Sequence, residues 1–299
     1  MLALFCFMRL ERNSPCKVNL ILNVLGKRPD GFHELETVLQ PISVCDTLTF
    51  ERLGPPTIEL TCSEPSLATD ASNLVHRAAT RFFELTAIHE GVRIHLEKRI
   101  PLAAGLGGGS GNAATTLLAL NDVFSRPLTP EQLHDVAASL GSDVPFFLQS
   151  QPALALGRGE RIQPLPAFAV LRRAFMLLIY PGFGISTAWT YENLARFPEA
   201  LNGRPGRAER LVALLGKSSV SAAAREFYNS LEAPVLQKYP VLALFQEMLR
   251  QHGAAATLMS GSGSTTFALF ENQAVAEDAV PRFKEKFGAR CWTAIVPLT

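Results

Sequence analysis

The stretch Pro101-Leu-Ala-Ala-Gly-Leu-Gly-Gly-Gly-Ser-Gly-Asn-Ala-Ala-Thr-Thr-Leu117 places five glycines within seven residues, directly before a segment typical of a helix. Glycine tolerates positive φ and lets the backbone approach a ligand closely, so successive N–H groups can converge on an anion. A helix over residues 112–124 would direct its free N–H groups and the positive end of its dipole toward the same anion. The stretch therefore predicts a phosphate-binding loop.

The spacing of the glycines does not fit the two most familiar phosphate-binding loops. A Walker-type loop requires a lysine after its last glycine, and no lysine occurs between Arg99 and Arg126. A dinucleotide-binding fingerprint counted from Gly105 places Ser110 where the third glycine belongs. A flexible linker is the alternative interpretation, but linkers have polar flanks and this stretch lies between apolar segments.

The composition is that of an ordinary globular protein. The 299 residues have room for two domains, and an apolar content of 47% can form their cores. The net charge of +1 does not favour a nucleic-acid partner or an anionic membrane. The five cysteines are odd in number and form no Cys-x-x-Cys pair, which favours a reduced, cytoplasmic setting and disfavours structural zinc.

The first eight residues are apolar but have no positively charged segment before them, and Arg9 follows at once. They are too short for a signal peptide or a membrane span. Translation that begins at Met8 is a hypothesis, which the intact mass of the natural protein would test.

Hydrophobic periodicity predicts a β-rich first half and a mixed second half. Strands are expected over residues 18–24, 35–42, 47–50, 92–96, 175–180, 255–259, 265–270 and 291–296. Helices are expected over residues 73–85, 112–124, 130–140, 186–194, 207–215 and 235–251. Residues 150–170, rich in Pro, Gly and Gln, are expected to connect two domains, 1–160 and 161–299. Because strands and helices do not alternate regularly, we predict an α+β fold with largely antiparallel sheets.

Three further segments could carry chemistry. Lys17 begins the first strand, and Asp143 directly precedes the apolar Val144-Pro-Phe-Phe147. Each charge alone is commonly a surface group, but a carboxylate beside an apolar run is either paired or at a cleft, because burying a lone charge is costly. The third segment, Ser260-Gly-Ser-Gly-Ser264, is a second glycine loop between two expected strands, and a simple hairpin turn is an equal alternative for it.

Five segments occur in a distinctive order: Lys17-Val-Asn-Leu20, Arg28-Pro-Asp-Gly-Phe-His-Glu-Leu35, the glycine stretch, Leu140-Gly-Ser-Asp-Val-Pro-Phe146 and Ser260-Gly-Ser-Gly263. This order and spacing resembles the GHMP kinase superfamily. The triple glycine and the Asp-Gly-Phe-His-Glu-Leu segment are similar to the branch that phosphorylates the 2-hydroxyl of 4-diphosphocytidyl-2-C-methyl-D-erythritol, in the non-mevalonate (MEP) pathway to isopentenyl diphosphate and terpenoids. These two segments distinguish that branch from the mevalonate and homoserine kinases. The resemblance extends from about Asn13 to the C-terminus and is weakest over residues 196–228.

The resemblance implies a two-domain fold, with an N-terminal ribosomal-protein-S5-like domain and a C-terminal ferredoxin-like α/β sandwich domain. It implies ATP and Mg²⁺ as cofactors, a small-molecule substrate, and a monomer or weak homodimer without nucleic-acid or membrane partners. The residues that would wrap the ATP phosphates, mostly through backbone amides, are Pro101, Leu102, Ala103, Ala104, Gly105, Leu106, Gly107, Gly108, Gly109, Ser110 and Gly111.

Lys17 and Asp143 match the catalytic lysine and aspartate of the family. A lysine close to the aspartate would keep it ionised, and the carboxylate could orient the attacking hydroxyl and accept its proton. Phosphoryl transfer has a loose transition state, so positioning and charge neutralisation should matter more than base strength. The second glycine loop adds Gly261, Ser262 and Gly263 to the candidate site.

On the substrate side, the resemblance assigns Phe32 to stacking on cytosine and His33 to contacting the edge of the base. Tyr191 would close the sandwich, with Phe183 as the alternative, and Asn19 matches a further substrate-binding position. From the residues alone, Phe32 would be a core residue, His33 a structural hydrogen-bonding group and Asn19 an outward-facing strand residue.

The chain departs from the family pattern at three positions. Ser110-Gly111 stands where two serines are common, which removes one hydroxyl at the expected start of the helix. Cys16 stands where alanine is usual and is expected to be a buried small residue. The Asn229-Ser-Leu-Glu232 segment has serine in place of an aspartate, so no catalytic role is assigned to it.

Three other functions stay open at this point. Another small-molecule kinase of the superfamily would be distinguished by the alcohol that supports ADP release. A nucleotide-binding regulator without catalysis is disfavoured by the intact Lys17 and Asp143. A nicotinamide-dependent redox enzyme is disfavoured by the glycine spacing.

Overall fold

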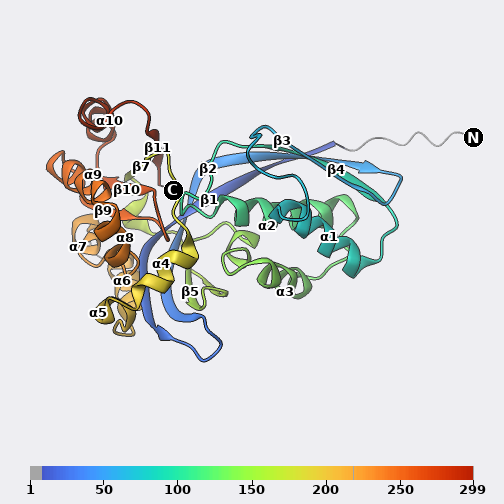
Figure 1. Ribbon diagram of the computed structural model, residues 1–299, viewed down its shortest axis with the longest axis horizontal. Helices are drawn as coiled ribbons and strands as arrows, with labels where there is room; N and C mark the ends of the chain where they lie inside the picture. The colour runs from blue at the N-terminus through green and yellow to red at the C-terminus, as the bar shows by residue number, and fades with distance from the viewer. Residues whose placement is uncertain (1–8, 218, 299) are drawn as a thin grey trace, which may run out of the picture. The chain divides into compact units, whose positions relative to one another are not determined.

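The computed structural model describes residues 9–217 and 219–298, so the hypothesis on residues 1–7 lies outside the described residues. The described chain forms two compact units, each assembled from segments that are separated in the sequence (Figure 1). The segments of the first unit are 9–16, 44–100 and 108–150. Those of the second unit are 17–43, 101–107, 151–217 and 219–298. The domain boundary expected near residue 160 stays a prediction.

The first unit contains paired strands and three helices, which lie on one side of the strands (Figure 1). β3 (Ile58–Cys62) pairs in parallel with β4 (Gly91–Glu97), and β4 pairs antiparallel with the end of β2 (His33–Leu53). In this register Phe50 lies opposite Ile94, and both are buried. The helical elements are α1 (Leu74–Thr86), α2 (Gly108–Val123), α3 (Pro130–Leu140) and the short η1 (Pro145–Leu148).

Local sequence signals mark the starts of two of these helices. The Asn73 side chain caps α1 by accepting a hydrogen bond of 2.9 Å from the N–H of Val75. Thr129 and Gln132 form a reciprocal capping box at α3, and Pro130 takes its first position. The expected helix over 112–124 begins instead at Gly108, four residues earlier.

β1 (Arg9–Lys27) and β2 are divided between the two units, and residues 17–43 belong to the second unit. The second unit also contains a separate four-stranded sheet of order β11-β7-β10-β9. The strands of that sheet are β7 (Phe175–Tyr180), β9 (Ala256–Met259), β10 (Thr266–Phe270) and β11 (Trp292–Pro297). All of its neighbouring strands are antiparallel. Two helices, α9 (Pro240–Gln251) and α10 (Gln273–Phe287), pack on this sheet. The rings of Phe245 and Phe283 make an edge-to-face contact between these helices, with centroids 4.7 Å apart.

The second unit contains further short strands and helices. They are β5 (Ala153–Gly157), β6 (Arg161–Pro164), β8 (Tyr228–Asn229), η2 (Ala169–Leu171), α4 (Thr187–Leu194), α5 (Pro198–Leu201), α6 (Arg207–Lys217), α7 (Val220–Ala224) and α8 (Glu232–Lys238). β5 pairs antiparallel with β2 and β6, and β8 pairs in parallel with β1. The α+β class with mainly antiparallel pairing is thus confirmed.

Several expected elements differ from the structure. The single helix predicted over residues 235–251 is two helices, because Pro240 has no N–H with which to continue α8. Residues 150–170, expected to be a connection, contain the hairpin of β5 and β6. β3 and α10 were not predicted. Among the described residues, no helix combines the length and apolar character that crossing a bilayer requires.

Candidate active site

The first half of the glycine stretch, residues 101–107, is irregular backbone in the second unit. Positive φ angles occur at Ala103 (50°), Gly105 (77°) and Gly107 (68°), with negative φ at the residues between them. Backbone that alternates in this way can turn successive N–H groups to one side, as in anion-binding nests. The conformation therefore fits the predicted phosphate loop.

The second glycine loop connects the antiparallel strands β9 and β10, so the hairpin interpretation describes its topology correctly. The loop also packs on the first one. The Ser260 hydroxyl donates to the Gly105 carbonyl at 2.9 Å, and the Thr265 N–H donates to the Ala104 carbonyl at 3.1 Å. A Cβ at Gly105 would collide with the Ser260 carbonyl oxygen.

Asn229 fixes the second loop from the β8 side. Its amide donates to the carbonyls of Met259 and Gly261, each at 2.8 Å, and the side chain is buried. The two remaining loop residues of the candidate site differ in environment: Gly263 has a positive φ of 88°, and the Ser262 hydroxyl lies 2.9 Å from the Thr187 hydroxyl. Asn229 thus has a structural function that its sequence pattern did not reveal.

The second half of the glycine stretch is the first turn of α2, in the first unit. The free N–H groups at this helix end consequently belong to residues 108–111 rather than to residues 112–115. Gly111 packs so closely on β1 that a Cβ would lie 2.5 Å from the Pro15 carbonyl oxygen. A Cβ at Gly108 would lie 3.0 Å from the Ile100 side chain. Packing, not loop flexibility, therefore requires glycine at Gly111, whereas a side chain at Gly108 would require a small shift of Ile100.

A buried carboxylate anchors the segment that leads into the glycine stretch. Asp46 has no exposed surface and accepts hydrogen bonds from the N–H groups of Arg99 (2.7 Å) and Ile100 (2.8 Å) and from the Asn112 amide (2.9 Å). It also forms an ion pair with the buried ammonium of Lys98. These contacts join three segments of the first unit, which are β2, residues 98–100 and α2. No sequence pattern pointed to Asp46.

Cys16 lies near this cluster and is fully buried, as predicted. Desolvation, with smaller contributions from Cys45 and Asp46, raises the pKa of the Cys16 thiol to about 12. The thiol is therefore a packing group rather than a nucleophile.

Lys17 lies in the second unit and is almost completely buried. Its ammonium donates to the Asn19 side-chain oxygen at 2.7 Å, and the Asn19 amide donates to the Thr37 hydroxyl at 2.8 Å. The Lys17 N–H donates to the Leu106 carbonyl at 2.9 Å, which ties β1 to the phosphate loop. The interpretation of Asn19 as an outward-facing residue is wrong, since Asn19 orients the lysine head group.

Asp143 lies in the first unit, in the turn between α3 and η1. It is partly exposed, whereas the adjacent Val144, Phe146 and Phe147 are buried. This environment matches the expectation of a carboxylate beside an apolar wall. The described residues contain no group of three or more acidic, His or Cys side chains that could hold a metal ion.

Phe32 and His33 lie at the turn into β2, in the second unit. Phe32 is 50% exposed, so its interpretation as a core residue is wrong. The His33 ring stacks on Tyr191 with centroids 4.9 Å apart and planes at 30°. Phe183 packs instead on Tyr239 at 5.2 Å. Partial burial, followed by the charge of Lys27, lowers the pKa of His33.

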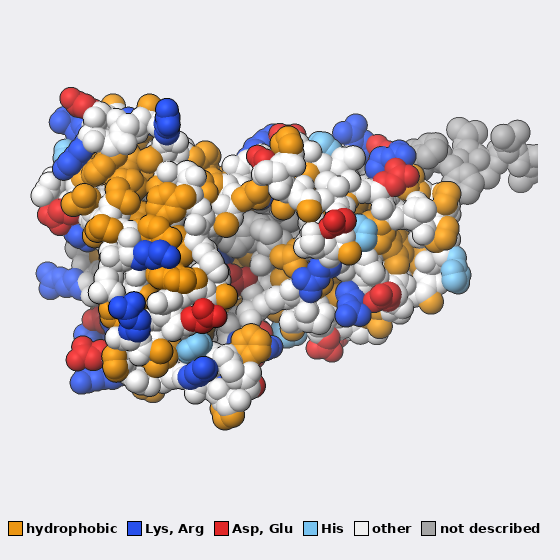
Figure 2. All heavy atoms as spheres, in the orientation of Figure 1, with side chains coloured by type: hydrophobic (Ala, Val, Ile, Leu, Met, Phe, Trp, Pro, Cys, Tyr) orange, Lys and Arg blue, Asp and Glu red, His pale blue; other side chains and the backbone are white. Residues whose placement is uncertain are grey.

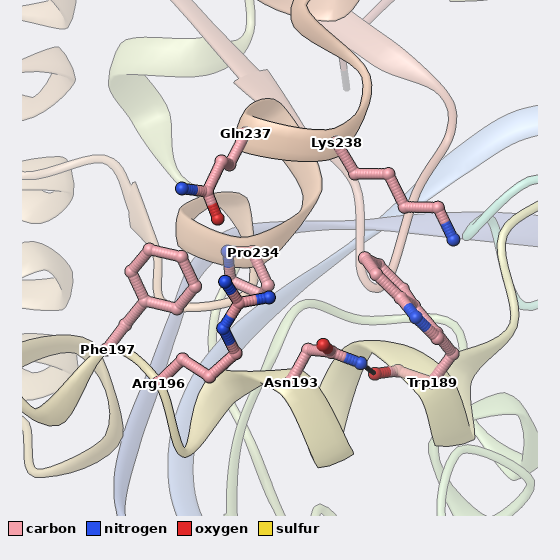
Figure 3. A pocket seen from close by; sticks show the side chains of 7 residues that line it. All are labelled: Trp189, Asn193, Arg196, Phe197, Pro234, Gln237 and Lys238. Atoms are coloured by element: carbon pink, nitrogen blue, oxygen red, sulfur yellow. Dashed lines mark hydrogen bonds between the residues drawn. The ribbon is translucent and has the colours of Figure 1, made fainter.

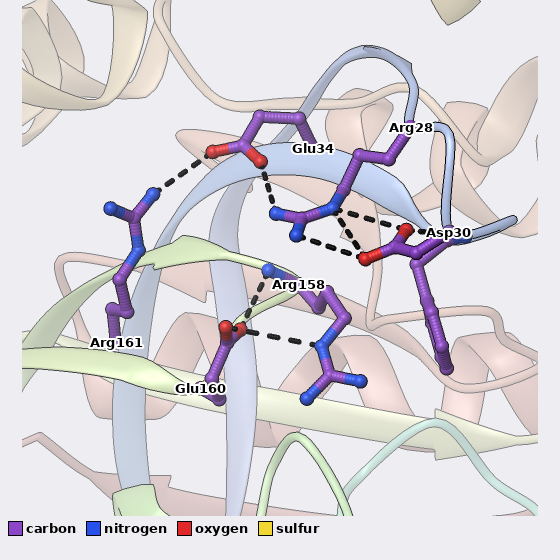
Figure 4. Close-up of polar contacts among 7 residues, drawn as sticks. Arg28, Asp30, Glu34, Arg158, Glu160 and Arg161 are labelled. Atoms are coloured by element: carbon purple, nitrogen blue, oxygen red, sulfur yellow. Dashed lines mark hydrogen bonds and ion pairs between the residues drawn. The ribbon is translucent and has the colours of Figure 1, made fainter.

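An ionic network holds the turn that carries Phe32 (Figure 4). The Arg28 guanidinium pairs with Asp30 (2.9 Å) and Glu34 (2.6 Å), and Asp30 accepts a hydrogen bond of 3.1 Å from the Phe32 N–H. The hydrogen bonds from Arg28 lower the pKa of the Asp30 carboxyl. Arg158, on the β5–β6 hairpin, places its guanidinium carbon 4.6 Å from the centroid of the Phe32 ring. Nothing in the sequence pattern pointed to Arg158.

A separate pocket of about 240 Å³ lies between α4 and α8 of the second unit (Figure 3). Its walls are Trp189, Asn193, Arg196, Phe197, Pro234, Gln237 and Lys238. The ammonium of Lys238 lies 3.9 Å from the Trp189 ring centroid. None of the predicted site residues lines this pocket, so it is not the candidate active site.

On the face of the molecule in view, Lys and Arg side chains are interspersed with Asp and Glu side chains (Figure 2). The described residues of this face form no continuous field of one sign, in keeping with the net charge of +1.

Two family models match the chain. The model for the GHMP kinases N terminal domain matches residues 73–151, and the model for the GHMP kinases C terminal domain matches residues 199–289. Together they cover more than half of the chain.

Curated relatives are similar over most of the chain. A 4-diphosphocytidyl-2-C-methyl-D-erythritol kinase of Treponema pallidum (strain Nichols) is 39% identical over 295 residues, which are 97% of this chain and 98% of that protein. The protein of the same name from Citrifermentans bemidjiense is 37% identical over 287 residues, covering 96% and 97%. A crystal structure of 4-(cytidine 5'-diphospho)-2C-methyl-D-erythritol kinase is 35% identical, with a TM-score of 0.80 and coverage of 96% and 99%.

The chain belongs to the GHMP kinase family, in the branch of the 4-diphosphocytidyl-2-C-methyl-D-erythritol kinases. It is accordingly an ATP-dependent small-molecule kinase. A homoserine kinase from Cytophaga hutchinsonii, at 18% identity and a TM-score of 0.76, shares the fold alone. The family predicted from the five sequence segments is confirmed.

Proposed function

We propose that this protein transfers the γ-phosphoryl group of ATP to the 2-hydroxyl of 4-diphosphocytidyl-2-C-methyl-D-erythritol, giving the 2-phosphate and ADP in the non-mevalonate pathway. The observation that carries the proposal is the identity of 36–40% to curated relatives of that name over most of the chain. The retained Lys17, Asp143 and Phe32-His33 segments support it.

We assign the chemical step to Asp143 and Lys17. In this assignment Asp143 orients the substrate hydroxyl and accepts its proton as the new P–O bond forms and the bond to the ADP oxygen breaks. Lys17 contributes a fixed positive charge that stabilises negative charge on the phosphoryl oxygens. The hydrogen bond from Lys17 to Asn19 supports this role, because it limits the positions that the ammonium can take.

We assign residues 101–111 to the ATP phosphates. The positive φ angles at Ala103, Gly105 and Gly107 and the early start of α2 at Gly108 support contacts made by backbone N–H groups. Mg²⁺ is usually held by phosphates with one or two carboxylates rather than by an all-protein cage. Asp143 is the carboxylate that we would place nearest the ion. When bound, the ion would neutralise negative charge on the phosphates.

We assign recognition of cytosine to Phe32, His33 and Tyr191. The exposed ring of Phe32 and the proximity of His33 to Tyr191 support this assignment. In the present state His33 stacks on Tyr191, so a base that stacks on Tyr191 would have to displace that ring. The lowered pKa of His33 keeps the imidazole neutral at pH 7, which leaves one ring nitrogen as a donor and the other as an acceptor.

The test is ADP release by purified protein with ATP, Mg²⁺ and the cytidyl alcohol. We expect turnover with wild-type protein and at least about a hundredfold loss in Asp143→Asn, within the range of general-base contributions. Asp135→Asn is the matched control, because the Asp135 side chain on α3 is 87% exposed. Turnover with mevalonate or homoserine but not with the cytidyl alcohol would reject the proposed substrate, and undiminished turnover by Asp143→Asn would reject the mechanism.

We further propose that the protein acts in the cytoplasm as a monomer or weak homodimer. The free state of the four described cysteines, Cys16, Cys45, Cys62 and Cys291, supports a reducing compartment. Sedimentation equilibrium across a range of concentrations tests the state of association, and a dimer that persists at nanomolar concentration would contradict it.

A further inference from the structure

Arg158 covers one face of the Phe32 ring. Its guanidinium carbon is 4.6 Å from the ring centroid, within the distance at which a cation over an aromatic face is attracted to it. Phe32 belongs to the turn before β2, whereas Arg158 belongs to the β5–β6 hairpin, and both lie in the second unit. The contact therefore joins two loops that are separated by more than a hundred residues.

The guanidinium is itself held in place. The backbone N–H of Arg158 donates to one Glu160 carboxylate oxygen at 2.7 Å. The Nε atom of the Arg158 guanidinium lies 3.9 Å from the other oxygen of that carboxylate (Figure 4). Only 32% of the Arg158 side chain is exposed. On the other side of the contact, Asp30 holds the backbone of Phe32 by accepting its N–H. Both partners of the stack are thus fixed from their own loops.

The other face of the Phe32 ring is open. The residue remains 50% exposed although a guanidinium covers one side, so the exposed area must come from the opposite face and the edge. The open face is where a planar base can stack.

We propose that Arg158 is a positioning residue for substrate recognition, which supports the Phe32 ring from behind so that its open face receives the cytosine of the substrate. This inference rests on the proposed function. A ring that is already fixed loses little rotamer freedom when the base binds, and this preorganisation lowers the entropic cost of binding. The contribution is made to the cytidyl substrate alone, because Arg158 acts through Phe32.

The experiment compares Arg158→Gln with wild-type protein by steady-state kinetics. We expect KM for the cytidyl alcohol to rise about fivefold, the effect of losing one partly exposed cation–π contact, while kcat and KM for ATP change less than about twofold. Arg158→Lys keeps the charge but not the planar group, and we expect it to recover part of the loss. Calorimetric binding of cytidine 5'-diphosphate should show the same order of affinities.

Two controls test whether the effect comes from stacking on Phe32 rather than from the loss of a charge. Arg161→Gln removes the same charge from the same hairpin, but Arg161 pairs with Glu34 and is 61% exposed, so we expect KM for the cytidyl alcohol to stay within about twofold of wild type. In a Phe32→Leu background, Arg158→Gln should have almost no further effect, because the coupling between the two residues is gone.

The outcomes are distinguishable. Wild-type protein that releases no ADP with the cytidyl alcohol would overturn the proposed function and this inference with it. Normal wild-type turnover with an unchanged KM in Arg158→Gln would overturn only the role of Arg158. An equal rise in Arg161→Gln, or a full effect of Arg158→Gln in the Phe32→Leu background, would likewise overturn it.

Discussion

Replacement of Asp46 by asparagine tests whether a buried carboxylate organises the first unit. Asparagine has nearly the same shape, and its oxygen can still accept the N–H groups of Arg99 and Ile100, which lie 2.7 and 2.8 Å from one Asp46 oxygen. The other oxygen, which faces the Lys98 ammonium and the Asn112 amide, would become an NH₂ group. Two accepting contacts would thereby become contacts between donors.

The magnitude follows from the burial of Lys98. Its side chain is only 5% exposed, so without Asp46 an ammonium would remain unpaired in the interior. Breaking a buried ion pair in this way costs about 3–5 kcal/mol. Since a domain is stable by about 5–15 kcal/mol, Asp46→Asn should remove a large share of the stability of the first unit.

The measurement is urea unfolding followed by far-UV circular dichroism. Tryptophan fluorescence would miss the effect, because both tryptophans, Trp189 and Trp292, lie in the second unit. Asp122→Asn serves as the matched control. Asp122 forms exposed ion pairs with Arg12 (3.3 Å) and Arg126 (3.2 Å), and their loss should cost about 1 kcal/mol.

A second variant separates charge from packing. Lys98→Met in the Asp46→Asn background removes the unpaired ammonium, so we expect the double variant to regain stability over Asp46→Asn alone. A loss in Asp46→Asn no greater than in Asp122→Asn, or a double variant less stable than the single one, would refute the reasoning.

Three further predictions concern single side chains. Gly111→Ser should destabilise the protein by about 1–3 kcal/mol in urea unfolding, because a Cβ 2.5 Å from the Pro15 carbonyl forces the backbone to move and outweighs the gain of about 0.5 kcal/mol in helix propensity. The folded-state pKa of His33 lies below its ordinary 6.5, so the neutral ring is favoured above pH 6.5 and this preference is lost as pH falls through the lowered pKa. KM for the cytidyl alcohol should therefore be flat above pH 6.5 and rise below it. A similar rise in His33→Gln would contradict this assignment. Iodoacetamide at pH 8 should leave Cys16 unmodified in the native protein, since its thiol has a pKa of about 12, and peptide mass mapping that finds Cys16 alkylated at native pH would disprove its burial.

Elements with strong local signals could be predicted from the sequence, and elements that depend on distant partners could not. α3 was predicted to the residue, because Thr129 and Pro130 mark its start and Gly141 its end. β5 and β6 were not predicted, because each is short and its edge pairing is decided by β2, more than a hundred residues away in sequence. The single helix predicted over 235–251 was wrong because apolar periodicity continues across Pro240 while the backbone hydrogen bonding does not.

The candidate site divides in the same way. Lys17, Asp143 and the glycine stretch were found because each belongs to a segment with a characteristic local pattern. Asp46 and Arg158 were missed, because their importance lies in what they contact. Asp46 accepts hydrogen bonds from Arg99, Ile100 and Asn112. Arg158 contacts the Phe32 ring, more than a hundred residues away in sequence. A one-dimensional pattern contains neither relation.

The glycines of the opening stretch show how one residue type can be selected for different physical reasons. Gly105 and Gly107 adopt positive φ, a backbone conformation that favours glycine and that a phosphate-binding loop is expected to require. Gly108 and Gly111 lie within α2 and have negative φ, and Gly111 is required by close packing on the Pro15 carbonyl. The distinction has a consequence for substitution. Alanine at Gly107 would strain the backbone through its φ of 68°, whereas alanine at Gly111 would keep a favourable helical backbone and fail by collision with β1.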